Sequence, residues 1–565
     1  MTKRFLLILA LALSARAQWP GDPALNMTVC GRTGEQTLPK VAASNHGCYV
    51  SWEDHASGNY DVYLQRLDAE GTPQWQEGGI AISTHPQETW ITDYDLAVDA
   101  QDNAVLVFND IRDGADRDIF AYLISPDGDF LWGPDGLTLS ANDGFEPDPR
   151  ICVTTGGNYV FAWQEDSVLH LRKVDVAGED LWNPAIITLS ATYTLSIPRL
   201  APAPEDGVLL QYLVAQGSQF WAPKHLYVQR FDAAGQPAWA GQGAPIETLG
   251  GFGPQMRPAI RADGAGGAWS YWYETRAGQL HAFAQHLMAD GNVAWTANGV
   301  ALSTTAGELQ EQPALIVDEQ GGPAEVELYY RVTDLNQNQA GIAGQRLSST
   351  GERLWGEGGR LLHPLSAEER HAVIAVRGPA DTTLVGHLAF PAGDVLNSRL
   401  VVEAVGNDHE AVWGPVEAAS TASQKGYLTA AVTPLGQLVA VWQDKRDDAD
   451  GDILLQNINP DGSLGLWQDT WLPVPARPRG ASLAEAWPNP FNPTTTLSFT
   501  LPEASHARLA VHDLRGVQVA LLTDRDWPAG THRLAFDAGG LPSGAYLCQL
   551  RTGSACVTRK LLLLR

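Results

Sequence analysis

Hydrophobic and polar residues alternate in short runs along most of the chain, and four such runs recur in each repeat. The second run of a repeat is the most apolar and ends on an aromatic residue, whereas the third alternates between apolar and polar side chains. Runs of this length and period are typical of β-strands. The pattern therefore predicts four antiparallel strands per repeat. In the first repeat they cover residues 39–44, 48–52, 61–68 and 75–83.

A glycine four residues before a tryptophan marks these repeats. Six copies are regular, a degenerate copy ends at Trp413, and the last copy, which ends at Trp467, carries one extra residue. Eight copies of a four-stranded unit predict an all-β, eight-bladed β-propeller over residues 18–470. A seven-bladed propeller is the alternative if the copy near Trp413 is irregular. The regular copies are Gly71/Trp75, Gly128/Trp132, Gly178/Trp182, Gly235/Trp239, Gly291/Trp295 and Gly351/Trp355.

The eighth repeat lacks a clear fourth strand before its end. Residues 24–29, near the start of the chain, resemble the fourth strands of the other repeats. We therefore expect this N-terminal segment to complete the last blade and to close the ring.

The first 17 residues have the pattern of a secretory signal peptide. Two basic residues precede nine uncharged apolar residues at 5–13, and Ala15-Arg16-Ala17 provides a small-x-small site for cleavage after Ala17. Nine apolar residues cover roughly half of a membrane span. We therefore expect a soluble, exported mature protein. A proline-rich stretch at 471–483 predicts an extended linker to a last domain at 484–565.

The last domain begins with a Pro/Asn-rich motif and continues in short alternating strands. The strings WPNPFNPTTTLSFTLPE, VHDLRGVQV and TRKLLLLR resemble the C-terminal sorting domain of the type IX secretion system. The resemblance implies a small immunoglobulin-like β-sandwich, related to that of flagellar hook-capping proteins. It also implies recognition by the type IX machinery and delivery across the outer membrane to the cell surface or the medium. The motif residues are Pro488, Asn489, Pro490, Phe491, Asn492 and Pro493.

Charge narrows the range of partners. The chain carries a formal net charge of −28, and residues 484–565 hold eight basic and six acidic residues. The whole chain has 37 basic and 65 acidic residues, and residues 1–17 hold three of the basic ones. Residues 18–483 therefore hold 26 basic and 59 acidic residues. Such a surface repels phosphate backbones, so nucleic-acid binding is not expected. With 44% hydrophobic and 18% charged residues, a largely disordered chain is also excluded.

Five cysteines are present. Cys548 and Cys556 flank a predicted terminal hairpin centred on Thr552, so we expect them to face each other in a disulfide. No CxxC motif and no Cys/His cluster suggests zinc.

Candidate binding residues lie in the hairpins between the second and third strands of the repeats. Because the strands alternate in direction, these hairpins share one face with the connections from each fourth strand to the next repeat; we call it the hairpin face. Its polar residues are either solvated turns or part of a site for a glycan, a peptide or a cation. The candidates are Asp54, His55, Asp110, Arg112, Asp113, Glu274, Arg276, Asp444 and Arg446.

One hairpin carries alternating carboxylates that could bind Ca²⁺. Asp448 and Asp450 are the candidate ligands, because Asp452 already matches Asp61 and Asp118 at the start of third strands. The alternative is a plain hairpin turn at Asp450-Gly451. We expect no other cofactor.

No motif for catalysis stands out: HExxH, GxSxG and a Walker loop are all missing. We therefore interpret the protein as an exported, surface-anchored or released propeller that acts in binding or adhesion. An extracellular hydrolase acting on glycans or peptides is one alternative. A structural component of a surface layer or matrix is the other.

Overall fold

The chain forms two compact units, residues 1–467 and 468–565. The computed structural model describes residues 18–85, 93–112, 117–317, 325–407, 409–447, 449–467, 482–483, 486, 489–501, 505–513, 517–527, 530–552 and 556–564. The predicted signal peptide with Ala17 and the predicted linker up to residue 481 lie outside these residues. Within the described residues no helix is long and apolar enough to cross a membrane.

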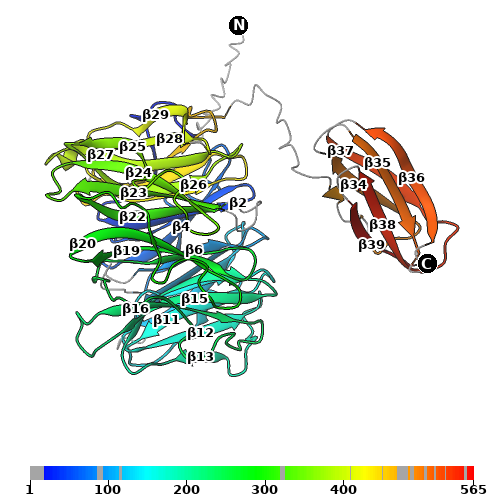
Figure 1. Ribbon diagram of the computed structural model, residues 1–565, viewed down its shortest axis with the longest axis horizontal. Coiled ribbons are helices and arrows are strands. Elements are labelled where there is room, and N and C mark those ends of the chain that lie inside the picture. The colour runs from blue at the N-terminus through cyan, green and yellow to red at the C-terminus, as the bar shows by residue number, and fades with distance from the viewer. Residues whose placement is uncertain are drawn as a thin grey trace, which may run out of the picture. The chain divides into compact units, whose positions relative to one another are not determined.

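The described part of the first unit consists of eight four-stranded antiparallel sheets, numbered 1 to 8 along the chain (Figure 1). Sheets 1 and 2 contain β2 (Gln36–Ser44), β3 (Gly47–Asp54), β4 (Asp61–Asp68), β5 (Ile80–Ser83), β6 (Asp95–Val98), β7 (Ala104–Asp110), β8 (Asp118–Ile124) and β9 (Leu137–Thr138). Sheets 3 and 4 contain β10 (Arg150–Val153), β11 (Tyr159–Glu165), β12 (Val168–Val174), β13 (Ile186–Leu189), β14 (Leu195–Ala203), β15 (Gly207–Ala215), β16 (Lys224–Phe231) and β17 (Ala244–Glu247).

The later sheets follow the same order, except that the last one borrows a strand. Sheets 5 and 6 contain β18 (Ala259–Ala262), β19 (Ala268–Arg276), β20 (Gln279–Leu287), β21 (Val300–Ala301), β22 (Glu308–Val317), β23 (Glu325–Asp334), β24 (Ala340–Ser348) and β25 (Arg360–Ser366). Sheet 7 contains β26 (Glu368–Arg377), β27 (Thr383–Pro391), β28 (Arg399–Val405) and β29 (Ala411–Ala419), with the short 3-10 helix η1 (Val395–Asn397). Sheet 8 contains β30 (Lys425–Val432), β31 (Leu438–Asp444), β32 (Asp452–Ile458) and β1 (Met27–Cys30).

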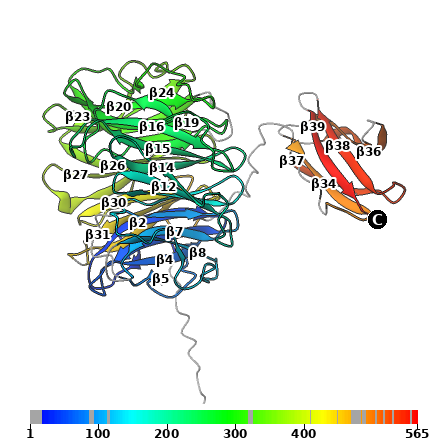
Figure 2. The same cartoon turned by 90° about the horizontal axis from the view of Figure 1, so that it is seen from below.

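The all-β prediction is confirmed, and the described part of the first unit is built of four-stranded antiparallel sheets. The fourth strand is shorter than predicted in sheet 1: β5 begins at Ile80, because Trp75 lies in the preceding hairpin, where Leu67 bridges to Pro73. The N-terminal segment pairs antiparallel with β32, with Met27 opposite Leu455, as the resemblance of residues 24–29 to a fourth strand predicts. Figure 2 shows β2 of sheet 1 near β30 of sheet 8, and the two strands are in contact.

The glycine–tryptophan spacing has a direct structural cause. Five of the six regular tryptophans pack on the turn glycine of the following sheet: a Cβ added to Gly291 would lie 2.7 Å from Trp239, and one added to Gly351 would lie 2.8 Å from Trp295. Trp355 packs on His409 instead, with the ring centres 4.6 Å apart. Both glycines have a positive φ, near 85°, which side chains rarely adopt. The indole Nε1 of Trp295 also donates a hydrogen bond to a carbonyl oxygen of that turn, at 3.0 Å. The repeat therefore encodes the packing of one sheet on the next.

The second unit consists of two antiparallel sheets that share one apolar core. Leu497 and Phe499 of the first sheet and Leu509, Val511 and Leu550 of the second are buried in it. In the described residues the sheets contain β33 (Ser482–Leu483), β34 (Thr494–Leu501) and β37 (Gly530–Asp537), and β36 (Gln518–Trp527), β35 (Ser505–His512), β38 (Gly544–Thr552) and β39 (Cys556–Leu563).

The predicted disulfide between Cys548 and Cys556 is wrong. The β38–β39 register places Cys548 opposite Arg559 and Cys556 opposite Arg551, three residues away from the predicted alignment. Cys548 is free and buried in the core, and burial raises the pKa of its thiol to about 12. The prediction placed the centre of the hairpin at Thr552 because the two cysteines are symmetric about it. The observed pairing has a different centre, so the two cysteines do not face each other.

Candidate functional site

The carboxylates predicted for a ligand surface are buried at the ends of second strands. Asp54 ends β3, Asp110 ends β7 and Asp444 ends β31, while Glu274 lies near the end of β19. All four are buried, so none of them is a solvated turn residue or an open ligand. Asp113, a further candidate, lies outside the described residues.

Three of these carboxylates pair with the arginine two residues further on. Arg112 Nε lies 3.0 Å from Asp110 Oδ1, and Arg276 NH2 bonds Glu274. Both guanidinium groups also stack on an aromatic residue of the adjacent third strand, with Arg112 Cζ 3.5 Å from the centre of the Phe120 ring. The aromatic ring and the carboxylate together hold the arginine at the hairpin, so each pair fixes its own sheet.

The third pair ties the last sheet to the N-terminal segment. Arg446 NH2 donates to Asp444 Oδ2 at 2.7 Å and to Asn26 Oδ1 at 2.8 Å. Although burial opposes ionisation of Asp444, its hydrogen bond to Arg446 and the charge of Lys425 lower its pKa. Burial in turn lowers the pKa of Lys425 to about 8.

Asp54 and His55 do not form a pair of this kind. Asp54 accepts a hydrogen bond from Arg32 NH1 at 3.3 Å, and the His55 ring lies 4.8 Å from that of Tyr60. The structure therefore groups the candidates within single sheets and does not combine them into one site.

The predicted calcium hairpin is described only in part. Asp448 lies outside the described residues, and the carbonyl oxygen of Asp450 lies 3.5 Å from Gln443 Nε2. Asp452 stands opposite Asp444 in the β31–β32 ladder, as Asp61 stands opposite Asp54, so the repeat accounts for it. Calcium binding stays a prediction.

Four exposed apolar side chains lie in connections on the hairpin face at sheet 4, and the sequence analysis missed them. We call Tyr193, Phe220, Trp221 and Leu249 the aromatic patch. Phe220 and Trp221 are each 75% exposed, Leu249 is 61% exposed and Tyr193 is 41% exposed. Two adjacent aromatic residues within Gln-Gly-Ser-Gln-Phe-Trp-Ala-Pro, where no strand pattern buries them, were the signal that could have found it.

Three segments contribute to the aromatic patch, and backbone contacts bring them together. Thr194, next to Tyr193, accepts a hydrogen bond from Ala215 N at 2.9 Å, at the base of the hairpin that carries Phe220 and Trp221. On the other side, a Cβ added to Gly250 would lie 2.7 Å from Pro223 Cβ. Lys224 Nζ lies 5.7 Å from the centre of the Phe220 ring and donates a hydrogen bond to the carbonyl oxygen of Phe220. Lys224, at the start of β16, therefore stabilises the hairpin that carries Phe220 and Trp221.

Two buried glutamates, Glu146 in the connection between sheets 2 and 3 and Glu247 at the end of β17, have strongly shifted pKa values. Burial, and then the charge of Glu274, raise the pKa of Glu247 to about 7. Burial also raises the pKa of Glu146 to about 7, although Ser140 and Asn142 donate hydrogen bonds to it. Both side chains are fully buried, so these shifts belong to the interior and not to a surface that a substrate reaches.

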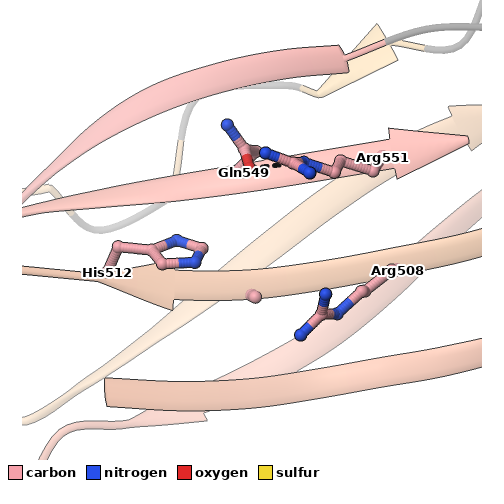
Figure 3. A pocket seen from close by; sticks show the side chains of 5 residues that line it. Arg508, His512, Gln549 and Arg551 are labelled. Atoms are coloured by element: carbon pink, nitrogen blue, oxygen red, sulfur yellow. Dashed lines mark hydrogen bonds between the residues drawn. The ribbon is translucent and has the colours of Figure 1, made fainter. Parts of the chain in front are cut away.

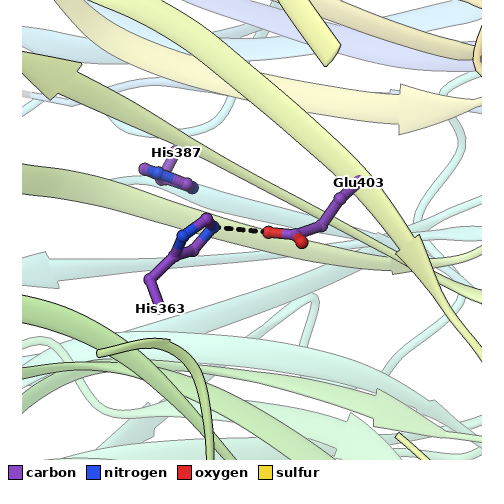
Figure 4. Close-up of side chains that lie close together, drawn as sticks. All are labelled: His363, His387 and Glu403. Carbon is purple, nitrogen blue, oxygen red and sulfur yellow. Dashed lines mark hydrogen bonds and ion pairs between the residues drawn. The ribbon is translucent and has the colours of Figure 1, made fainter. Parts of the chain in front are cut away.

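His363, His387 and Glu403 form a second cluster, between sheets 6 and 7 (Figure 4). His363 Nε2 lies 2.6 Å from Glu403 Oε1, and the two imidazole rings are 4.8 Å apart at an angle of 65°. Burial, and then the charge of His363, hold the pKa of His387 well below its ordinary value of 6.5. Sequence analysis missed this cluster because three strands contribute one residue each, without a spacing motif.

The second unit presents a basic pocket on the sheet that contains β35 and β38. Arg508, Ala510, His512, Gln549 and Arg551 line a shallow hollow of ≈ 100 Å³ (Figure 3). Its only carbonyl-bearing side chain, Gln549, accepts a hydrogen bond from Arg551 Nε at 2.7 Å.

The motif at the start of this unit is tied to its last strand. Asn489 accepts a hydrogen bond from Leu562 N at 2.8 Å and donates one to the Lys560 carbonyl oxygen at 3.0 Å. Phe491 is buried and bridges in parallel to Leu563. Pro490, Asn492 and Pro493 are described beside it, whereas Pro488 lies outside the described residues. The motif therefore fixes the start of this unit to its last strand, β39.

Comparison with known families identifies the second unit. Residues 485–564 match the family model described as a secretion system C-terminal sorting domain. The second unit is a sorting domain of this type. It indicates export through type IX secretion to the cell surface or the extracellular space, and it implies interaction with that machinery.

Solved structures similar to the chain are distant in sequence. An α-L-arabinanase of Penicillium chrysogenum has 14% identity and a TM-score of 0.34, over 56% of this chain and 94% of that one. A PL25 ulvan lyase has 10% identity and a TM-score of 0.41, over 69% and 99%. A protein of unknown function from Dyadobacter fermentans has 14% identity and a TM-score of 0.32, over 55% and 92%. A search of curated proteins finds no match.

Proposed function

We propose that the first unit is a closed, eight-bladed β-propeller that binds neutral extracellular glycan chains through the aromatic patch. Eight core clusters support this architecture, each formed by two consecutive sheets. One of these clusters joins Val441 and Leu455 of sheet 8, with Met27 of β1, to Val50 and Trp52 of sheet 1. A stack with two free ends would leave these faces in water, at about 25 cal/mol for each Å² of apolar surface.

The observation that carries the binding proposal is the exposure of Phe220 and Trp221 side by side at the tip of one hairpin. Exposed apolar groups that gather in one place on a soluble protein mark binding surfaces. Aromatic rings offer flat apolar faces, and Trp and Tyr add a polar edge that can bond a hydroxyl group. The apolar face of a sugar ring and its hydroxyl rim fit such a surface.

The negative charge of the first unit favours neutral glycans over anionic ones. Residues 18–483 carry 26 basic against 59 acidic residues, so their field repels anionic polysaccharides. A neutral glycan has no such repulsion to overcome. A single shallow patch gives weak binding, and repeated sugar units along one chain compensate through multivalency.

Burial of the carboxylates favours binding over hydrolysis. A glycosidase needs two carboxyl groups that reach the scissile bond. Asp54, Asp110, Glu274 and Asp444 are all buried, and each of them is ion-paired with an arginine. The proposal therefore assigns these residues to the scaffold and the aromatic patch to the ligand.

A glycan array with the mature full-length protein tests the proposal. We expect binding to a subset of neutral glycans, and a loss of at least about tenfold in affinity for Phe220→Ala and Trp221→Ala. Leu354→Ala is the matched control, because this exposed leucine lies in the hairpin between third and fourth strands, at the opposite end of the sheets. No bound neutral glycan, or unchanged binding in both patch variants, overturns the proposal. Shortened products in mass spectrometry would instead establish the hydrolase alternative.

A further inference from the structure

We propose that His363, His387 and Glu403 form a zinc site that crosslinks sheets 6 and 7. No motif in the sequence predicts this site. The proposal does not depend on the proposed glycan binding. One imidazole nitrogen from each histidine and one oxygen of Glu403 all lie within 4.8 Å of one another. Ligands of a tetrahedral zinc ion lie about 3.3 Å apart, given Zn–N distances near 2.0–2.1 Å. Small side-chain rotations are therefore enough to reach that geometry.

The strand register explains why two of the ligands share a face. In sheet 7, Val385 stands opposite Glu403 and His387 stands opposite Val401, so the side chains of His387 and Glu403 project from the same face. That face packs on sheet 6, where Tyr329 and Ile342 join Val385 and Val405 in one core cluster. His363 lies on β25 opposite Ile342, so it enters the same layer from sheet 6.

The surroundings of His387 point to a missing partner. Its side chain is 1% exposed, and its Nδ1 is buried without a hydrogen-bond partner. An unpaired polar atom in this position destabilises the folded state, because burial removes its hydrogen bonds to water. A metal ion that takes the lone pair of an imidazole nitrogen would satisfy the ring, because histidine binds metals as neutral imidazole.

The donor set selects the type of metal. Two imidazoles with one carboxylate suit zinc and similar transition metals, whereas Ca²⁺ and Mg²⁺ prefer oxygen ligands only. The carboxylate of Glu403 supplies one negative charge within the layer. Two nearby arginines, Arg370 and Arg399, are both ion-paired with Glu368, so their charges are balanced in part. His363 is the partly exposed member and leaves an approach for the ion.

A zinc ion bound here would add to the stability of the folded state. It would join β25 of one sheet to β27 and β28 of the next, and it binds only when these sheets are packed. Without it, the His363–Glu403 ion pair joins the two sheets at this position, in addition to the Arg331–Glu369 ion pair.

The test uses tag-free mature protein that is stripped of metal and then titrated with ZnSO₄. We expect one zinc per chain by elemental analysis and a rise in Tm. In His363→Gln and Glu403→Gln the affinity for zinc should fall more than about tenfold, and the rise in Tm should disappear. Co²⁺ should give the visible absorption of a tetrahedral site in the wild type and not in His363→Gln or Glu403→Gln.

The chain supplies a matched control in His170, which pairs with Glu165 at 2.6 Å but has no third ligand beside it among the described residues. His170→Gln should bind zinc like the wild type. His387→Gln tests the buried ligand. If His387→Gln does not fold, His363→Gln still tests the site, because His363 is partly exposed. A wild type that binds no zinc, or equal zinc binding in the wild type and His363→Gln, overturns the proposal.

Discussion

Trp19 packs against the turn glycine Gly71, more than fifty residues further along the chain. A Cβ added to Gly71 would lie 2.6 Å from the Trp19 ring, and Trp19 Nε1 donates a hydrogen bond to the Ala69 carbonyl oxygen at 2.9 Å. Trp75 makes the same contacts with sheet 2, where Nε1 bonds the Pro126 carbonyl oxygen. The N-terminal segment therefore provides sheet 8 with both a fourth strand and a docking tryptophan.

Trp19→Ala should destabilise the first unit severely. The side chain is buried between sheets 8 and 1, and replacing a buried tryptophan by alanine costs roughly 3–5 kcal/mol. Thermal and denaturant unfolding of the mature protein should show a much lower midpoint. Trp221→Ala removes an exposed indole and should leave the midpoint unchanged. Equal midpoints for Trp19→Ala and the wild type would contradict ring closure by the N-terminal segment.

The arginine–carboxylate pairs should act on stability and not on ligand binding. Arg112→Ala leaves Asp110 buried without its main partner, and loss of one member of a buried pair costs about 3–5 kcal/mol. We expect a clear loss of stability, and glycan binding per folded molecule equal to that of the wild type. His55→Ala, in the hairpin of another sheet, should change neither. Binding that falls while stability holds would restore the ligand interpretation of Arg112.

The repeat could be predicted because its determinants are local. Gly71 and Trp75 stand four residues apart in one hairpin, so their spacing is visible in the sequence, although Trp75 itself docks on Gly128 of the next sheet. The role of Trp19 could not be predicted in the same way, since no glycine stands four residues before it.

A second feature of the first strands escaped the sequence analysis. Leu38, Ile197, Gln312, Ala372 and Tyr427 all have a positive φ, and each lies at a shift of register between first and second strands. Such bulges depend on how the sheets meet and not on local propensity, because non-glycine residues rarely adopt this conformation. The cluster of His363, His387 and Glu403 could not be predicted for the same reason: the packing of two sheets, and not a spacing in the sequence, brings the three residues together.

Removal of the sorting domain should block export and leave the first unit folded. The two units have separate cores, and residues 485–564 carry the match to the sorting domain. In a host with type IX secretion, the chain without residues 484–565 should stay in the periplasm with an unchanged melting transition of the first unit. Recovery of that truncated chain from the medium at wild-type levels would contradict this role.

Two buried glutamates should each contribute stability that is lost as the pH rises from 5 to 8, whereas the lowered pKa of His387 acts in the opposite direction. Burial raises the pKa of Glu146 and of Glu247 to about 7, above the ordinary value of 4.5. The folded protein therefore binds these protons more tightly, so their contribution is complete below about 4.5 and is lost as the pH passes about 7. Each pKa unit corresponds to about 1.4 kcal/mol.

Glu146→Gln should flatten this dependence, since the amide cannot ionise, whereas the exposed Glu179→Gln should leave it unchanged. The difference in Tm between pH 5 and pH 8 is the measurement. An identical difference in the wild type and Glu146→Gln would show that Glu146 does not carry the effect.

Calcium binding at the β31–β32 hairpin can be tested separately from zinc. The start of β32 needs no metal, because Asp452 stands opposite Asp444 as Asp118 stands opposite Asp110. If Asp448 and Asp450 nevertheless bind Ca²⁺, millimolar Ca²⁺ should raise the Tm of metal-stripped protein, and Asp448→Asn with Asp450→Asn should abolish that rise. The calcium-free variant should melt like the calcium-free wild type. Measurement in the His363→Gln background removes any contribution from zinc. A wild-type Tm that Ca²⁺ does not change would leave the hairpin as a turn and nothing more.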